Sequence, residues 1–315
     1  NPNCAELIPN TPELIVRFEN LAAQKLDFTE VLEELAQANG TDVPSIGTFL
    51  CALQFEGIKS ISLLRRYFEG LNGLSSDDRK RLFDTKFARM FGRDTVINRA
   101  WIAESNSKAI DVNKAPSDYE AIANILVNWG EMELATSAFA AQAVLLDEYK
   151  KNSEGALLVL AAAKRQFPEA LDILRAETRI RFNTGEFDKA LDIGRRVLDS
   201  PKLLDDISAS YLVREVAISA AKLGRLKLAH DYFRQGYEQS ARLGGADKYI
   251  LPMTIGLLAD AAICSWKSGE KALAISEMSK AVEMLADLPF DESLRASHCH
   301  RVSRFVLLGF NIEAH

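Results

Sequence analysis

The sequence is poor in cysteine, in proline and glycine, and in long apolar runs, and each shortage excludes a class of protein. Its four cysteines are far apart among 315 residues and form no CxxC pair, so neither a disulfide framework nor a cysteine-based zinc motif is expected. The 17 glycines and 9 prolines are too few for a long low-complexity or disordered segment. We expect a folded chain whose cysteines are buried free thiols.

No apolar run approaches the length of a membrane-spanning helix. The longest, "ALLVLAAA" at 156–163, is less than half of the roughly 20 residues that a bilayer requires. The chain begins at Asn1 without the basic region and apolar core of a signal peptide. We therefore expect a cytoplasmic protein, and the absence of an initiator Met suggests a processed or truncated chain.

Residues that could catalyse a reaction or bind a metal are also sparse. The two histidines of "HCH", His298 and His300, would point to different faces of a helix, so they would not converge on one ion. No phosphate-binding GxxxxGK[ST] motif is present. The adjacent acid pairs are typical of helix caps or solvated charges and show no sign of a catalytic pocket: Glu33 with Glu34, Asp77 with Asp78, and Asp205 with Asp206. We expect no catalytic residue, no metal and no cofactor.

What the sequence does show, along almost its whole length, is apolar residues at helical spacing. In "PELIVRFENLAAQKL" (12–26), Leu14, Phe18 and Leu21 fall on one face of a helix. Ser117 with Glu120 predicts a capping box at the start of a helix that ends at Gly130. No stretch between turn signals alternates polar and apolar residues, so no sheet is expected. The predicted fold class is all-α.

A pattern of small residues recurs around four glycines of the C-terminal two thirds. An alanine follows each glycine by five residues, and a small residue precedes each glycine by seven. Such a pattern is what two closely packed antiparallel helices need, because glycine can end the first helix in a left-handed conformation and small side chains allow the backbones to approach. A bulky residue nine positions on would fill the wedge between neighbouring pairs. The glycines are Gly130, Gly185, Gly224 and Gly269, and the alanines are Ala135, Ala190, Ala229 and Ala274.

This pattern resembles the tetratricopeptide repeat over about residues 117–289, with the best copies at 212–237 and 257–282. The intervals between the glycines exceed the family's repeat of about 34 residues, and the longest predicts an extra helix at 153–166. Glu177 and Arg181 stand where the family prefers apolar residues. The resemblance implies an all-α, right-handed solenoid of antiparallel helix pairs over 116–315, and a helical N-terminal region over 1–115 that caps the repeats or docks a partner.

The resemblance also implies a binding surface, because tetratricopeptide proteins line a concave groove with the first helix of each pair. In this chain, the resemblance implies that the groove-facing positions are those two, three, six and ten residues before each glycine. Arginine and asparagine there would hold a peptide's carboxylates and backbone, and a tryptophan would act as an anchor. The predicted groove residues are Asn124, Asn128, Arg175, Arg179, Asn183, Arg214, Lys222, Trp266 and Lys267. Alternatively, these bases pair with Glu177, Glu215 and Asp260 on adjacent turns.

A basic stretch at 59–99 follows an acidic one at 1–58. Its interleaved aromatic residues allow a nucleic-acid patch or a docking surface for an acidic protein. Phe83, Phe87 and Phe91 recur at every fourth position, however, which favours a buried stripe with the bases on the solvated face. The net charge of −6 also argues against a general nucleic-acid binder.

These features predict a non-enzymatic scaffold or adaptor that binds an acidic or C-terminal segment of a protein partner in a concave groove. The alternative is the sensor or regulatory region of a larger multidomain protein. Extended copies with linkers such as "ARLGGADKYILP" (241–252) resemble the sensor arms of signal-transduction NTPases of the STAND class. An enzyme built on this helical scaffold is the third alternative.

Overall fold

The computed structural model describes residues 65, 68, 69, 113–200, 209–244 and 251–286. Within these ranges every regular element is an α-helix and no strand occurs, which confirms the all-α prediction. The predictions for most of the N-terminal region 1–115, including the aromatic stripe of the basic stretch, and for the "HCH" cluster lie outside the described residues. The predicted boundary at 115/116 lies at the start of the described helices and stays a prediction.

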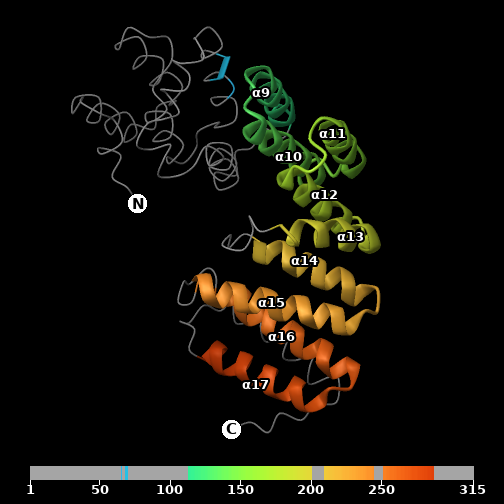
Figure 1. The fold of residues 1–315 in the computed structure, drawn as a ribbon, viewed down its shortest axis with the longest axis vertical. Helices are drawn as coiled ribbons and strands as arrows, with labels where there is room; N and C mark the ends of the chain where they lie inside the picture. The colour runs from blue at the N-terminus through green and yellow to red at the C-terminus, as the bar shows by residue number, and fades with distance from the viewer. Residues whose placement is uncertain (1–64, 66–67, 70–112, 201–208, 245–250, 287–315) are drawn as a thin grey trace, which may run out of the picture. The chain divides into compact units, whose positions relative to one another are not determined.

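The described helices follow one another along the chain (Figure 1). They are α9 (Ala115–Trp129), α10 (Met132–Glu148), α11 (Ser153–Gln166), α12 (Leu171–Asn183), α13 (Phe187–Leu198), α14 (Ala209–Lys222), α15 (Leu226–Gly244), α16 (Leu251–Ser268) and α17 (Lys271–Ala286). The chain divides into two compact units, residues 1–176 and 177–315, with the division inside α12. In the first unit α10 packs against α9 and α11, and in the second unit each helix from α13 to α17 packs against the next.

The start of α9 differs from the prediction. The helix begins at Ala115, and Pro116 occupies its first turn, where the missing N–H is not needed and the fixed φ suits a helix. The Ser117 hydroxyl donates to the carbonyl oxygen of Lys114 at 2.7 Å, so Ser117 lies inside the first turn and does not cap it. The predicted capping box of Ser117 and Glu120 is therefore wrong, because the helix with Pro116 in its first turn has its N-cap at Lys114, three residues upstream of Ser117.

All four turn glycines adopt the left-handed conformation that the pattern predicted. Their φ values are 77° at Gly130 and Gly185, 74° at Gly224 and 91° at Gly269. In each turn the glycine N–H donates to the carbonyl three residues back, and the next N–H donates to the carbonyl five residues back at 2.9 Å. This pair of hydrogen bonds is the Schellman motif, which satisfies the last carbonyls of the first helix. The chain reverses its direction there.

Replacing Gly224 by alanine isolates the conformational requirement of one turn, because an added Cβ would meet nothing within 4 Å. We expect Gly224→Ala to lower the free energy of unfolding by about 1 kcal/mol, the cost of a left-handed alanine. Gly224→Asn should cost less, because asparagine tolerates this conformation. Urea unfolding followed by circular dichroism would measure both. Equal stability of the wild type and the alanine variant would contradict the turn geometry.

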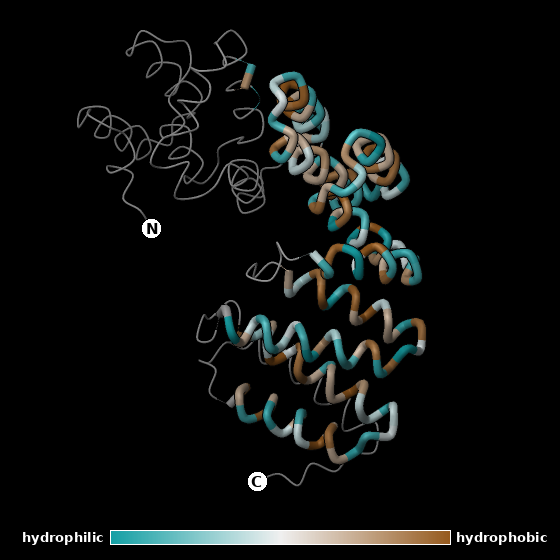
Figure 2. The backbone as a smooth tube through the Cα atoms, viewed as in Figure 1, coloured by the Kyte–Doolittle hydropathy of each residue, from teal (hydrophilic) through white to brown (hydrophobic). Residues whose placement is uncertain are grey.

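The small residues on either side of each turn are buried. The alanines five residues after the glycines have no exposed surface, and neither do Ala123, Thr178, Ala217 and Ala262, seven residues before them. Along α14 to α17 brown and teal stretches alternate at helical spacing (Figure 2). The core of each pair is therefore built where the pattern placed it, from side chains small enough for two backbones to approach.

In each helix pair of residues 177–286 the first helix is α12, α14 or α16, and the second is α13, α15 or α17. Helices α13 and α15 each have a glycine where they lie between two first helices. A Cβ on Gly194 of α13 would lie 2.3 Å from Val216 Cγ2 of α14 and 3.1 Å from Thr178 Cγ2 of α12. A Cβ on Gly236 of α15 would lie 3.0 Å from Val213 of α14 and 3.3 Å from Leu257 of α16. Helices α13 and α15 thus each lie close to their own first helix and to that of the next pair.

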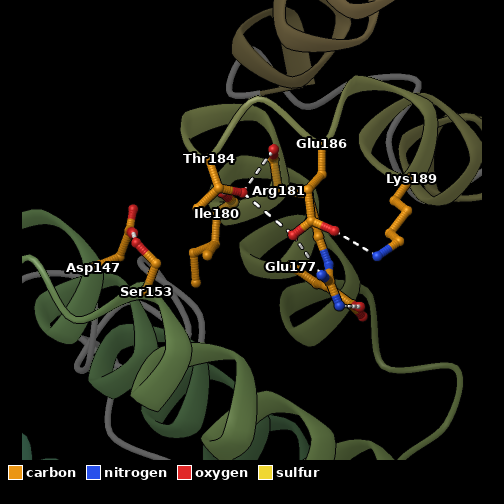
Figure 3. Close-up of polar contacts among 8 residues, drawn as sticks. All are labelled: Asp147, Ser153, Glu177, Ile180, Arg181, Thr184, Glu186 and Lys189. Carbon is orange, nitrogen blue, oxygen red and sulfur yellow. Dashed lines mark hydrogen bonds and ion pairs between the residues drawn. The ribbon is translucent and has the colours of Figure 1, made fainter.

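The extra helix predicted at 153–166 is confirmed as α11, with the bounds expected. Its N-cap is Asn152, whose side chain accepts the N–H of Gly155 at 2.9 Å. The hydroxyl of Ser153 donates to Asp147 at the end of α10, which fixes the direction in which the chain enters α11 (Figure 3). This helix accounts for the long interval between Gly130 and Gly185.

Candidate functional site

The nine predicted groove residues divide between the two units. In the first unit, Asn124 and Asn128 are exposed one turn apart on α9, and Arg175 is half-buried on α12. In the second unit, the side chains of Arg179, Asn183, Lys222 and Lys267 are exposed, and those of Arg214 and Trp266 are half-buried. The contacts at Gly194 bring the helix of Arg179 against the helix of Arg214 and Lys222. None of the nine is fully buried, so each presents some surface to solvent.

The exposed charges of the second unit differ between first and second helices. Between 177 and 286, the exposed residues of the first helices α12, α14 and α16 are Arg179, Asn183, Tyr211, Lys222, Lys267 and Ser268. This set contains three bases and no acid. The second helices α13, α15 and α17 expose acids and bases together, for example Asp188 with Lys189 and Glu283 with Lys280. The first helices therefore offer a surface of one charge sign, which favours an acidic ligand.

The acids of these first helices are less exposed than Arg179, Lys222 and Lys267. Glu177 is buried, and Glu215 and Asp260 are half-buried. Glu177 forms an ion pair with Arg181, N to O 3.7 Å, and Arg181 also binds Glu186 at 2.6 Å (Figure 3). Hydrogen bonds from Lys189 and Arg181 lower the pKa of Glu186. The two charged residues that depart from the family's apolar preference are thus accommodated by pairing with each other and with the turn that follows.

Trp266 is engaged by its own chain. The ammonium nitrogen of Lys271, at the start of α17, lies 5.4 Å from the centroid of the Trp266 ring, within the range of a cation–π contact. The ring is half-buried. A ligand that used Trp266 as an anchor would share the ring with this lysine.

Tyr211 is an exposed aromatic residue that the sequence prediction did not include. Its side chain is 60% exposed, on the same side of α14 as Arg214, Ile218 and Lys222, which follow at three, seven and eleven residues. The prediction stopped ten residues before the turn glycine, and Tyr211 is one helical turn further, thirteen residues before Gly224. Extending the series by that turn would have found it.

A buried polar cluster joins the last three described helices. The carboxylate of Glu277 on α17 accepts from the Ser265 hydroxyl of α16 at 3.2 Å and lies 3.0 Å from His230 Nε2 of α15. Arg234 of α15 approaches the same carboxylate at 3.7 Å. Among the described residues no group of three or more histidines, cysteines or acids could hold a metal. The cluster links the pair that contains α15 to the pair of α16 and α17.

The nearby cysteine is a core residue. Cys264 is a buried free thiol, and burial raises its pKa to about 12. A thiol with such a pKa is almost wholly protonated at neutral pH and is therefore a poor nucleophile. This agrees with the expectation of buried free thiols for the one cysteine in the described part of the chain.

None of the described helices is both long and apolar enough to cross a membrane. No protein-family model matches the chain, and a search of curated proteins finds no match either. The function must therefore be argued from the residues and their geometry.

Proposed function

We propose that this chain is a non-enzymatic scaffold or adaptor of the cytoplasm. In this proposal, helix pairs similar to tetratricopeptide repeats stack into a right-handed solenoid. The first helices line its concave face and bind an acidic or C-terminal segment of a protein partner. The left-handed glycines, the buried alanines and the glycine-mediated contacts between successive pairs support the repeat frame.

The observation that carries the proposed ligand class is the charge asymmetry of the second unit. Its first helices expose Arg179, Lys222 and Lys267 and no acid, whereas its second helices expose both signs. Exposed bases on one set of helices give complementarity to carboxylates at little desolvation cost. Exposed Asn183, beside Arg179 on the same helix end, could hydrogen-bond the backbone of an extended peptide.

A library of random heptapeptides with free C-termini, panned on the immobilised chain, tests this proposal. We expect enrichment of Asp and Glu, with affinity that falls as salt rises. Binding of a selected peptide should weaken about tenfold or more in the double variant Arg179→Ala, Lys222→Ala, because charge-assisted hydrogen bonds contribute about 1.5–3 kcal/mol each. Fluorescence anisotropy would measure the affinity.

The matched control removes one arginine and one lysine from a second helix, in the double variant Lys227→Ala, Arg242→Ala on α15. It changes the net charge equally and should leave peptide binding unchanged. If both double variants weakened peptide binding equally, the loss of affinity would reflect net charge alone. That result would overturn the proposal that the first helices form the peptide-binding groove. Enrichment of basic or uncharged peptides would overturn the ligand class.

The second candidate, a sensor region of a larger protein, has one observation in its favour. Helices α16 and α17 contain 18 and 16 residues, so this pair fills the family's repeat of about 34 residues before its turn and linker are counted. Extended pairs of this kind are similar to the sensor arms discussed above. A reading frame that continues into an NTPase domain would select this candidate, and the ligand-binding face would be common to both.

A further inference from the structure

The face of α14 that carries Tyr211 combines apolar and basic side chains in alternation. Its order along the helix is Tyr211, Arg214, Ile218 and Lys222. The residues between them that pack on neighbouring helices are buried, including Leu212, Val213, Val216, Ala217 and Ala220. The four named residues form a stripe that is three helical turns long, and the other residues of α14 that are not buried are Glu215 and Ala221.

The dimensions of this stripe suit a short extended peptide. Eleven residues of helix between Tyr211 and Lys222 rise by about 16 Å, which an extended chain covers with about five residues. A peptide of that length could place one side chain on the Tyr211 ring and Ile218 while its carboxylates reach Arg214 and Lys222. Glu215, the acid of this helix, is half-buried as Arg214 is, and Lys222 is exposed.

Tyr211 differs from other exposed large apolar residues in the helix that carries it and in its neighbours on that helix. Leu158, Leu273 and Ile275 are also exposed, but they lie on helices outside the acid-free surface. Single exposed apolar residues need no explanation. An exposed ring that shares one helix face with two bases and a half-buried isoleucine has the composition of a binding hot spot, with an aromatic anchor and charge-assisted partners.

We infer that the ligand of this surface carries a large apolar or aromatic side chain within a few residues of its acids, and that Tyr211 and Ile218 select it. This inference rests on the proposed function, since it concerns the same surface. The occupant is an acidic peptide segment of a partner protein, and the apolar side chain distinguishes it from acidic segments in general. A contact between two aromatic rings, together with the apolar area that it buries, should raise the binding affinity about tenfold.

The same heptapeptide library tests the inference with a different readout. The wild type should enrich Phe, Tyr, Trp, Leu or Met near the acids, and Tyr211→Ala should lose that enrichment while keeping the acids. For one selected peptide and its version with the apolar residue replaced by Ala, the wild type should prefer the first about tenfold. Tyr211→Ala should bind the two peptides equally, and Tyr211→Phe should restore the preference.

The control is Tyr149→Ala, which removes a tyrosine of 41% exposure that follows α10, outside the first helices. It should leave both the enrichment and the tenfold preference unchanged. Enrichment of acids without any apolar preference would overturn the role of Tyr211 and leave the proposed function standing. A library without acidic enrichment would overturn both, and a Tyr211→Ala variant that weakens the two peptides equally would show a structural role only.

Discussion

Replacing Gly194 by alanine is expected to lower the free energy of unfolding by about 1–3 kcal/mol, the usual cost of overfilling a packed core. The new Cβ would lie 2.3 Å from Val216 Cγ2 and 3.1 Å from Thr178 Cγ2, whereas carbon atoms pack at about 3.5–4.0 Å. Val216 and Thr178 have no exposed surface, so neither can move into solvent. The sign of this change in the free energy of unfolding is informative, because alanine in a helix interior otherwise stabilises by about 0.5–1 kcal/mol relative to glycine.

A second substitution tests whether steric crowding between the new Cβ at position 194 and Val216 causes the loss of stability. Val216→Ala removes the methyl group that the new Cβ would meet, so the double variant should be more stable than the sum of the two single changes predicts. Gly236→Ala is the matched comparison, with nearest contacts of 3.0 Å to Val213 and 3.3 Å to Leu257, and it should cost less. Urea unfolding measures all four variants. A stabilising Gly194→Ala would contradict the close approach of α12, α13 and α14.

The turns and the inner positions of the helix pairs could be predicted from the sequence because they depend on local rules. A left-handed residue favours glycine wherever it occurs, and a close approach favours alanine. Gly224 and Ala229 follow these rules in the same way as the other copies. The helix at 153–166 was also predictable, since an interval far longer than one repeat has to contain additional structure.

The departures from the pattern depend on contacts that a one-dimensional pattern does not contain. The position nine residues after the turn glycine is bulky in three copies and is Gly194 in the fourth, and the structure supplies the reason, since Val216 of the next pair fills the space. Glu177 is tolerated because Arg181 lies close enough to form ion pairs with both Glu177 and Glu186. The start of α9 was wrong because Pro116 was given less weight than Ser117. Tyr211 was missed because the series of groove positions stopped at ten residues before the turn glycine, one helical turn short of it.

Glu277 illustrates the contacts between pairs that no local pattern indicates, and its replacement by alanine is the second change expected to have a large effect. The side chain is 4% exposed and is the common partner of Ser265, His230 and Arg234, the last two from a helix about 40 residues earlier in the chain. Without Glu277, His230 keeps Asp231 and Arg234 keeps Glu238 as partners, but the Ser265 hydroxyl loses the acceptor described above. Ser265 is itself buried, so its hydroxyl would lose its hydrogen bond without gaining water.

We expect Glu277→Ala to lower the free energy of unfolding by about 2–4 kcal/mol, from the lost charged hydrogen bonds and the cavity that remains. Glu277→Gln keeps the shape and one acceptor, so it should cost less. Glu283→Ala removes an exposed glutamate from the same helix and should stay within about 0.5 kcal/mol of the wild type. Urea unfolding measures the three variants under one condition. A cost for Glu277→Ala equal to that of Glu283→Ala would mean that this cluster does not hold α15, α16 and α17 together.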